Sequence, residues 1–144
     1  MVGEELVRPS ASAYFVWWRA LLLLFLGERD QARTACREAR RRVESESAGN
    51  RELLHPLFDY LDGTISEEAL LEKAVGSSKR LLCSAHLAIG LTRLSGGDRD
   101  GARDHFAAGV ATRNIENWEY DWNRAFLARL EKDRTWPKWI RVKK

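Results

Sequence analysis

The sequence of 144 residues contains little proline, cysteine and glycine: 3, 2 and 10 residues respectively. So few prolines and glycines exclude a collagen-like or loop-dominated fold. The two cysteines, Cys36 and Cys83, cannot form a disulfide framework, and no CxxC or Cys/His cluster indicates zinc. The excess of one charge sign is also small, because 24 Lys and Arg residues are nearly matched by 21 Asp and Glu residues. A net charge of +3 is well short of that of a dedicated nucleic-acid binder.

Hydrophobic residues make up 44% of the chain and charged residues 31%. This composition excludes intrinsic disorder as the bulk state. A chain of this length fits one domain and can bury its own core. The sequence therefore predicts a single folded domain over residues 1–144, with both cysteines as inert, buried thiols.

The longest apolar run, ASAYFVWWRALLLLFL at residues 11–26, is short for a membrane span. A spanning helix needs about 20 apolar residues, and a central charge such as Arg19 costs about 3 kcal/mol. Glu4 and Glu5 precede the run, whereas a signal peptide begins with positive charge. The run predicts a buried helix, no transmembrane segment and a cytoplasmic location, with a signal anchor as the alternative.

A seven-residue motif occurs twice, as GERDQAR at 27–33 and GDRDGAR at 97–103, with five identical positions. The offset of 70 residues is twice 35, so a third copy is expected between them, and residues 63–69 fit. In each copy a glycine can end an apolar helix, and acidic residues favour the start of the next helix. A small residue then lies where two helices cross: Ala32, Ala69 or Ala102.

This pattern resembles the tetratricopeptide repeat over about residues 11–131. The resemblance is best over 83–110, where small and large residues stand at the family's packing positions: Ile89, Gly90, Gly97, Ala102, Phe106 and Gly109. The first copy matches through Ala20, Gly27, Ala32, Cys36 and Ala39, and the second keeps Tyr60 and Ala69. His86 and Arg93 replace aromatic residues of the family, and its helix-ending proline is absent. Residues 119–130 look like the final helix of bacterial lipoprotein-type tetratricopeptide proteins.

Helical periodicity and this resemblance predict an all-α fold without a sheet: an α-solenoid of three tetratricopeptide-like helix pairs plus a C-terminal capping helix. We expect helices at 11–26, 29–46, 51–62, 66–75, 79–95, 99–112 and 115–131. Repeat 1 then spans 11–46, a degenerate repeat 2 spans 51–75, and repeat 3 spans 79–112, before the capping helix at 115–131. An N-terminal arm (1–10) and a basic tail (132–144) flank the solenoid.

In the family, the first helix of each pair lines a concave groove. The resemblance carries this role onto nine residues: Tyr14, Trp17, Leu21, Arg51, Leu54, Phe58, Ser84, Leu87 and Leu91. Such an apolar groove suits a peptide or an amphipathic helix, unless self-association or another domain buries it. Adjacent helical residues diverge by about 100°. Of Trp17 and Trp18, one should therefore lie in the core and the other should face the concave surface or an interface.

We expect no catalytic residue, metal site or cofactor. His55, His86 and His105 stand in no Ser-His-Asp, HExxH or Walker-type context. His86 falls on a packing position of its helix, and His105 follows Asp104, whose side chain points away from it on a helix.

The tail at 134–144, RTWPKWIRVKK, combines five cations with two tryptophans and no acid. It can fold back on the capping helix, or contact nucleic acid, an anionic membrane surface or a partner protein. The candidate contact residues are Arg134, Trp136, Lys138, Trp139 and Arg141. The sequence as a whole predicts a non-catalytic adaptor that binds another protein in the groove. The alternatives are a nucleic-acid-associated protein that uses the tail and a self-assembling scaffold subunit.

Overall fold

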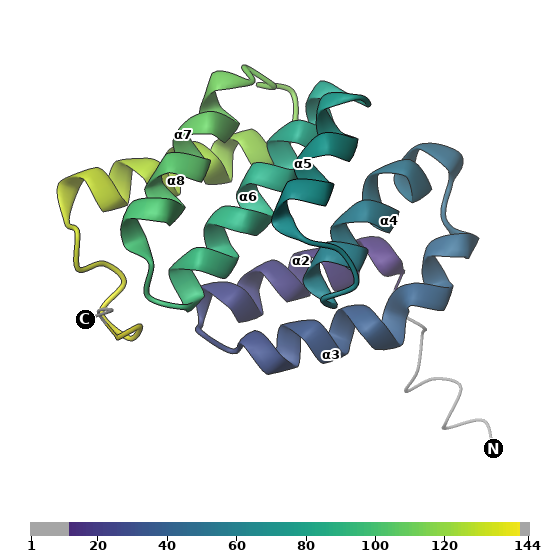
Figure 1. Cartoon of the computed structure of the whole chain (residues 1–144), viewed down its shortest axis with the longest axis horizontal. Helices are drawn as coiled ribbons and strands as arrows, with labels where there is room; N and C mark the ends of the chain where they lie inside the picture. The colour runs from purple at the N-terminus through teal and green to yellow at the C-terminus, as the bar shows by residue number, and fades with distance from the viewer. Residues whose placement is uncertain (1–11, 142–144) are drawn as a thin grey trace.

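A computed structural model of the protein describes residues 12–141, about three quarters of which are helical (Figure 1). Within this range there are seven α-helices, one 3₁₀ helix and no strand. They are α2 (Ala13–Phe25), α3 (Arg29–Ala39), η1 (Arg40–Ser45), α4 (Ala48–Leu61), α5 (Glu67–Val75), α6 (Lys79–Ser95), α7 (Arg99–Ala111) and α8 (Trp118–Lys132). The all-α prediction is confirmed for these residues. The predicted arm and the end of the tail, residues 142–144, lie outside them.

Each predicted helix is present, and three boundaries differ by more than two residues, including the start of α4, which lies at Ala48 rather than 51. The helix expected at 29–46 is α-helical only to Ala39 and continues as the tighter 3₁₀ helix η1. At this change Arg40 reaches α4, where its guanidinium pairs with Asp59 at 2.5 Å and Asp62 at 3.3 Å. The last helix begins at Trp118 rather than 115, because Arg113 has a φ of +55° and reverses the chain after α7.

Three glycines of the repeated motif end helices as the sequence predicted. Gly27, Gly63 and Gly97 have φ values of +85°, +90° and +84°, a conformation that other residues rarely adopt. Serine side chains cap the starts of α2, α4, α5 and α6 by accepting a hydrogen bond from a first-turn backbone N–H. Local sequence signals therefore set most of the helix ends.

Helix α6 is the centre of the molecule and contacts α2, α4, α5, α7 and α8. It packs most closely on α7, where Gly90 faces the ring of Phe106. A Cβ atom at position 90 would lie 2.5 Å from that ring. The small residue expected at this crossing is therefore required by the geometry.

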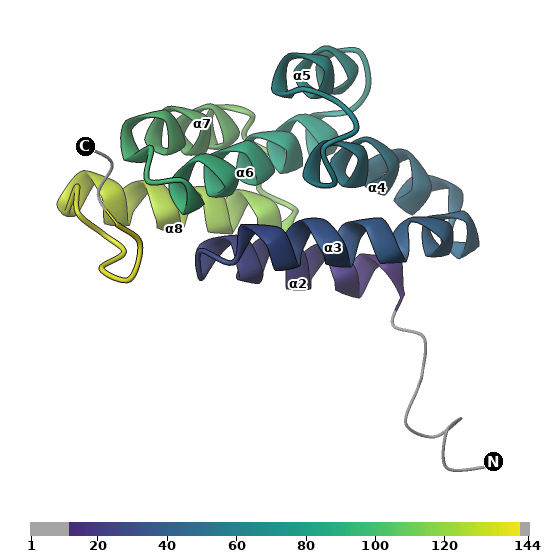
Figure 2. The ribbon, with the colours of Figure 1, turned by 60° about the horizontal axis from the view of Figure 1, so that its bottom comes forward.

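Helices far apart in the sequence also meet. Helix α2 contacts α6 as well as α3 and α4. Figure 2 shows α8 beside α2 and beneath α6 and α7. Aromatic contacts join α8 to α2, with the ring centroids of Phe25 and Phe126 5.3 Å apart and those of Trp18 and Trp118 5.0 Å apart. The first and last described helices thus share one core.

Candidate functional site

The nine residues predicted to line an open groove lie mainly in the protein core. Trp17, Leu21, Leu54, Phe58, Ser84, Leu87 and Leu91 are all fully buried, and only Tyr14 and Arg51 are half-exposed. Buried side chains cannot bind a partner without unfolding. The prediction of an open groove at these positions is therefore corrected: they hold the helices together.

Helix α8 covers the part of the expected groove that α2 and α6 form. The Trp118 indole N–H donates to the Tyr14 hydroxyl at 2.7 Å, and the Trp118 ring lies 6.4 Å from that of Trp17. The Ser84 hydroxyl donates to the buried Glu119 carboxylate at 2.9 Å. Two of the predicted groove residues, Tyr14 and Ser84, thus bind the chain's own last helix.

Arg80 completes this buried polar cluster between α2, α6 and α8. Its guanidinium donates to the Tyr14 hydroxyl at 2.6 Å and lies 3.7 Å from the Glu119 carboxylate. Glu119 is fully buried, so this nearby positive charge offsets part of the cost of taking its carboxylate out of water. Sequence reasoning missed Glu119, because neither neighbouring residues nor spacing indicates that an acid at this position points inward.

The exposed apolar residues of α2 form a different candidate surface. Phe15, Trp18, Leu22 and Leu26 are between 40% and 68% exposed. Their spacing of three, seven and eleven residues from Phe15 places them on one face of the helix. We call these four residues the α2 stripe. The opposite face of α2 is buried, so the helix is apolar on both sides.

The sequence contained a signal for this stripe. The expectation that one of Trp17 and Trp18 lies in the core is confirmed, and that residue is Trp17, which is fully buried. Trp18, expected at the concave surface or an interface, is 40% exposed. The same periodicity, continued from Trp18 to Leu22 and back to Phe15, identifies the outer face. The whole run was interpreted as one buried helix because it contains little that is polar.

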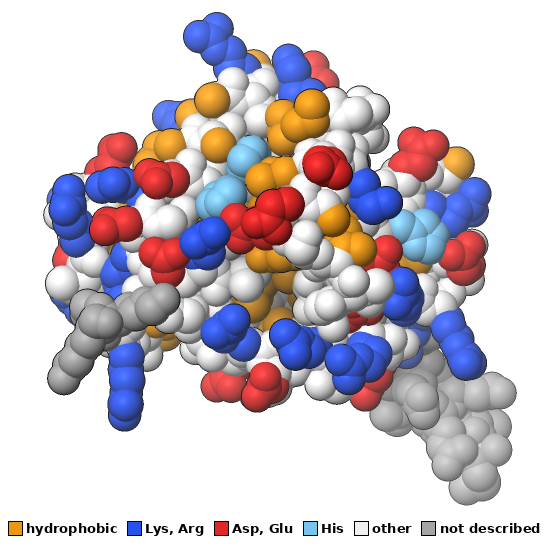
Figure 3. Space-filling model, in the orientation of Figure 1, with side chains coloured by type: hydrophobic (Ala, Val, Ile, Leu, Met, Phe, Trp, Pro, Cys, Tyr) orange, Lys and Arg blue, Asp and Glu red, His pale blue; other side chains and the backbone are white. Residues whose placement is uncertain are grey.

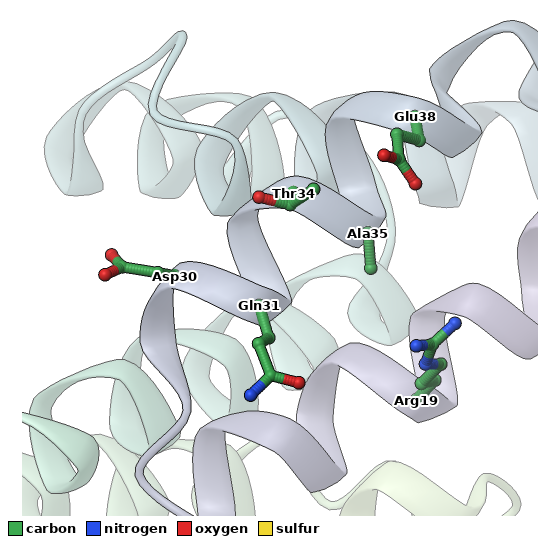
Figure 4. Close-up of a pocket in the computed structure, with 6 residues that line it drawn as sticks. All are labelled: Arg19, Asp30, Gln31, Thr34, Ala35 and Glu38. Carbon is green, nitrogen blue, oxygen red and sulfur yellow. The ribbon is translucent and has the colours of Figure 1, made fainter.

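One side of the α2 stripe is polar. Between α2 and α3 lies a shallow hollow of about 280 Å³, in which Arg19 faces Gln31, Ala35 and Glu38 across the helix pair (Figure 4). Asp30 and Thr34 complete its lining. On its other side the stripe meets the aromatic residues of α8, with Trp18 touching Trp118 and Trp122. An apolar centre with a polar margin is the usual composition of a protein interface.

Two of the predicted contact residues of the tail, Trp136 and Trp139, are held against the body of the protein. The Trp136 ring packs on Phe25 and Phe126, at centroid distances of 5.5 and 5.9 Å. The Trp139 indole N–H donates to the Phe25 carbonyl at 2.9 Å, although its ring is half-exposed. Lys138 pairs with Asp133 at 2.9 Å. Arg134 and Arg141 are exposed.

Arg99 holds the tail from the other side. Its guanidinium donates hydrogen bonds to five tail carbonyls, at distances from 2.6 to 3.3 Å: those of Thr135, Trp136, Pro137, Ile140 and Arg141. The arginine itself is buried. The fold-back alternative for the tail therefore describes residues 132–141. The sequence shows no sign of the role of Arg99, because its partners are backbone atoms.

The histidines His86 and His105 belong to a chain of polar contacts that joins α5, α6 and α7. Their Nδ1 atoms lie 3.0 Å apart, and His105 Nε2 lies 3.3 Å from the Glu67 carboxylate. Glu67 also pairs with Arg93 at 2.8 Å. Burial, and then the neighbouring His105, lower the pKa of His86 to about 4. Burial also lowers the pKa of His105. Both rings are therefore neutral at pH 7, and one Nδ1 donates while the other accepts.

Over residues 12–141, no three His, Cys, Asp or Glu side chains are grouped to hold a metal ion. Burial raises the pKa of the Cys36 thiol to about 12, and burial also raises that of Cys83. Among the described helices, none has the length and apolarity needed to cross a bilayer. Comparisons with protein-family models, curated proteins and solved structures gave no match.

Proposed function

We propose that the protein is a non-catalytic interaction module that binds an amphipathic helix of a partner protein along the α2 stripe. The observation that carries this proposal is the exposure of four large apolar side chains on one face of a helix whose other face is core. A helix that is apolar on all sides is normally covered on all sides. Contiguous exposed apolar surface is typical of sites of interaction.

The internal repeat supports a helix as the ligand. Seventy residues after the stripe, the matching positions of α6 are Ala85, Ala88, Thr92 and Gly96. There Ala85 and Ala88 are fully buried, and α4 contacts α6. In α6 this face is thus covered by a preceding helix. The partner helix would take the place against α2 that α4 takes against α6.

This proposal includes the tetratricopeptide-like solenoid as the architecture. The helix pairs, the left-handed glycines at the motif turns and the Gly90–Phe106 contact support it. It differs from the family's arrangement in the position of the ligand. The partner binds at the end of the stack, on the outer face of α2, because the inner faces of α2 and α6 already pack on α8.

The margin of the stripe indicates which helix fits. On the α3 side, Asp30 and Glu38 line the hollow with Arg19, and no described residue forms an ion pair with either acid. Their carboxylates are available to basic side chains at the edge of the partner's apolar face. We therefore propose a partner helix with an apolar stripe of about three turns and Lys or Arg along one border.

A capture experiment with matched variants tests the proposal. Wild type, Leu22→Gln and Val75→Gln proteins are immobilised and exposed to nuclease-treated lysate of the source cells. Bound proteins are identified by mass spectrometry and their affinity for the purified chain is then measured. Val75 is an exposed apolar residue on α5, away from the stripe, and controls for loss of surface apolarity. We expect a partner whose affinity falls about tenfold with Leu22→Gln and is unchanged with Val75→Gln.

Three results would contradict this proposal. A partner that binds wild type and Leu22→Gln equally would bind elsewhere on the chain. A wild-type dimer in sedimentation experiments that Leu22→Gln converts to monomer would instead assign the stripe to contact between copies. Captured protein that disappears on nuclease treatment would favour the nucleic-acid alternative.

A further inference from the structure

A second candidate site lies on another part of the surface, where α3, α4, α5 and α6 meet. A cavity of about 220 Å³ opens there. Its basic wall is formed by Arg29 and Arg33 of α3, and other lining residues are Leu24, Tyr60, Leu61, Gly63, Ile65, Ser66, Glu67 and Thr92. In Figure 3, basic side chains run along the edge formed by α3, with hydrophobic atoms exposed between them and a group of acidic side chains.

The side chains of the two arginines are held in place by packing, but no acid of the described residues is paired with their positive charge. The Arg33 guanidinium carbon is 3.7 Å from where a Cβ of Gly63 would lie. An Arg29 guanidinium nitrogen is 3.3 Å from where a Cβ of Gly96 would lie. Each guanidinium thus rests on a glycine at the end of a helix. Across residues 12–141, neither arginine forms a salt bridge.

The one acid that lines the cavity is already hydrogen-bonded to Arg93, which it shares with Asp98 at 2.8 Å. Both oxygens of Glu67 accept hydrogen bonds from Arg93, at 2.8 and 3.2 Å, and His105 is 3.3 Å from one of them. Ser66 adds a donor. Its oxygen accepts from the Ala69 N–H at 3.1 Å, which leaves the hydroxyl hydrogen free to donate. The site therefore offers two positive charges and one neutral donor to a ligand.

The chain itself shows what an arginine at this position of the motif does when oxygen atoms are in reach. Arg99 is the counterpart of Arg29, 70 residues later, and donates to five carbonyl oxygens of the tail. Arg29 has no such segment beside it. In addition, the counterpart of Arg33, Arg103, has an acid 3.9 Å away, whereas Arg33 has none. The acids of the first copy, Glu28 and Asp30, lie beside Arg29 and Arg33 in a neighbouring hollow but form no salt bridge with either arginine within residues 12–141, so both guanidinium groups can bind an anion from outside the chain.

We propose that this cavity binds the phosphate group of a small phosphomonoester. Two guanidinium groups balance the two charges of a phosphate dianion and present paired N–H donors to its oxygens. A single carboxylate carries one charge and has two oxygens, so it would use only part of these donors. The Ser66 hydroxyl donates to a further oxygen. The buried Leu24 and Leu61 form an apolar floor for the organic part. The volume is below the 300 Å³ at which pockets for larger organic ligands begin, so the ligand is small.

The test is a titration of the whole chain with inorganic phosphate at constant ionic strength, in which NMR signals of the backbone amides are monitored. We expect saturable chemical-shift changes at Gly63, Ser66 and Gly96. The dissociation constant for phosphate should rise about tenfold in both Arg29→Gln and Arg33→Gln. Arg37→Gln is the matched control. It removes the same charge from the same helix, one turn beyond Arg33, but Arg37 does not line the cavity.

Each of the other outcomes would overturn the proposal. Loss of affinity in Arg37→Gln equal to that in Arg33→Gln would show attraction to the general charge of α3. Acetate that binds as tightly as phosphate would exclude a site for the dianion. Shifts that do not saturate, or that lie away from the cavity, would show that no site exists. Thermal unfolding of each variant checks that the fold is intact.

Discussion

The two copies of the motif, 27–33 and 97–103, are nearly identical in sequence but lie in different surroundings. In the later copy, Arg99 is buried under the tail and bonded to five carbonyls. In the earlier copy, Arg29 is exposed beside an open cavity. The repeat therefore sets the turn and the start of the helix, whereas the function of its arginine depends on which segment lies next to it.

The same comparison extends to the helices before and after the turn. Gly90 and Phe106 of the later copy correspond, 70 residues earlier, to Ala20 and Cys36. All four residues are fully buried or in close contact within the core. In the later copy the smallest residue, Gly90, is paired with the large Phe106. In the earlier copy the larger Ala20 is paired with the smaller Cys36, so both helix pairs fill their core with different combinations of side chains.

Separate replacement of Arg99 and Arg29 should show the difference between their roles most clearly. We expect Arg99→Ala to lower the free energy of unfolding by about 3 kcal/mol, because it leaves several tail carbonyls without a donor. For a chain of this size this lowers Tm by about 6–12 °C. Arg29→Ala should change stability by less than about 0.5 kcal/mol. Thermal unfolding followed by circular dichroism gives both values, and equal effects would refute the comparison.

Exchange of the small residues should give effects of unequal size. We expect Gly90→Ala to cost about 1–2 kcal/mol, because the new methyl group overlaps the Phe106 ring and outweighs the gain in helix propensity. Ala20→Gly, the reverse change in the earlier copy, should cost about 2 kcal/mol, because helix propensity and a buried methyl group are both lost. Gly49→Ala is the control, since nothing lies within 4 Å of its Cβ position. Urea unfolding measures all three, and a neutral Gly90→Ala would show that the helices separate freely.

A smaller effect is expected from the histidine pair, whose counterparts in the earlier copy are Val16 and Ala35. The folded-state pKa of His86 is lowered to about 4, so below pH 6.5 the unfolded chain binds more protons than the folded chain. Stability should therefore be complete at pH 7 and decrease as the pH falls from about 6.5 towards 4. Urea unfolding across this range measures the slope.

The variant His86→Val places the residue of the earlier copy at this position. It should reduce the pH dependence between 6.5 and 4, of which part should remain because burial also lowers the pKa of His105. It also removes the hydrogen bond between the two rings, so stability at pH 7 should fall by about 1 kcal/mol. A wild-type protein whose stability is constant over this range would contradict a neutral, buried His86. Nuclear magnetic resonance titration of the His86 ring gives its pKa directly.

The helices could be predicted from sequence because their signals are local. Periodicity, the glycines of the motif and the serine caps lie within the segments they control. The closure of α8 onto α2 could not be predicted, since it depends on contacts such as Trp118 with Tyr14 that are 104 residues apart. The groove prediction failed for this reason. It assigned the right residues to the inner faces of the helices, but not the helix that covers them.

The clamp of Arg99 on the tail has a consequence for how the end of the chain responds to proteases. Five hydrogen bonds and the packing of Trp136 make residues 135–141 part of the same folded unit as the start of α7. Digestion from the C-terminus should therefore pause near Arg141, and go further only when the α6–α7 turn opens. The rate of that second cleavage would then report local opening of the turn rather than the accessibility of the tail itself.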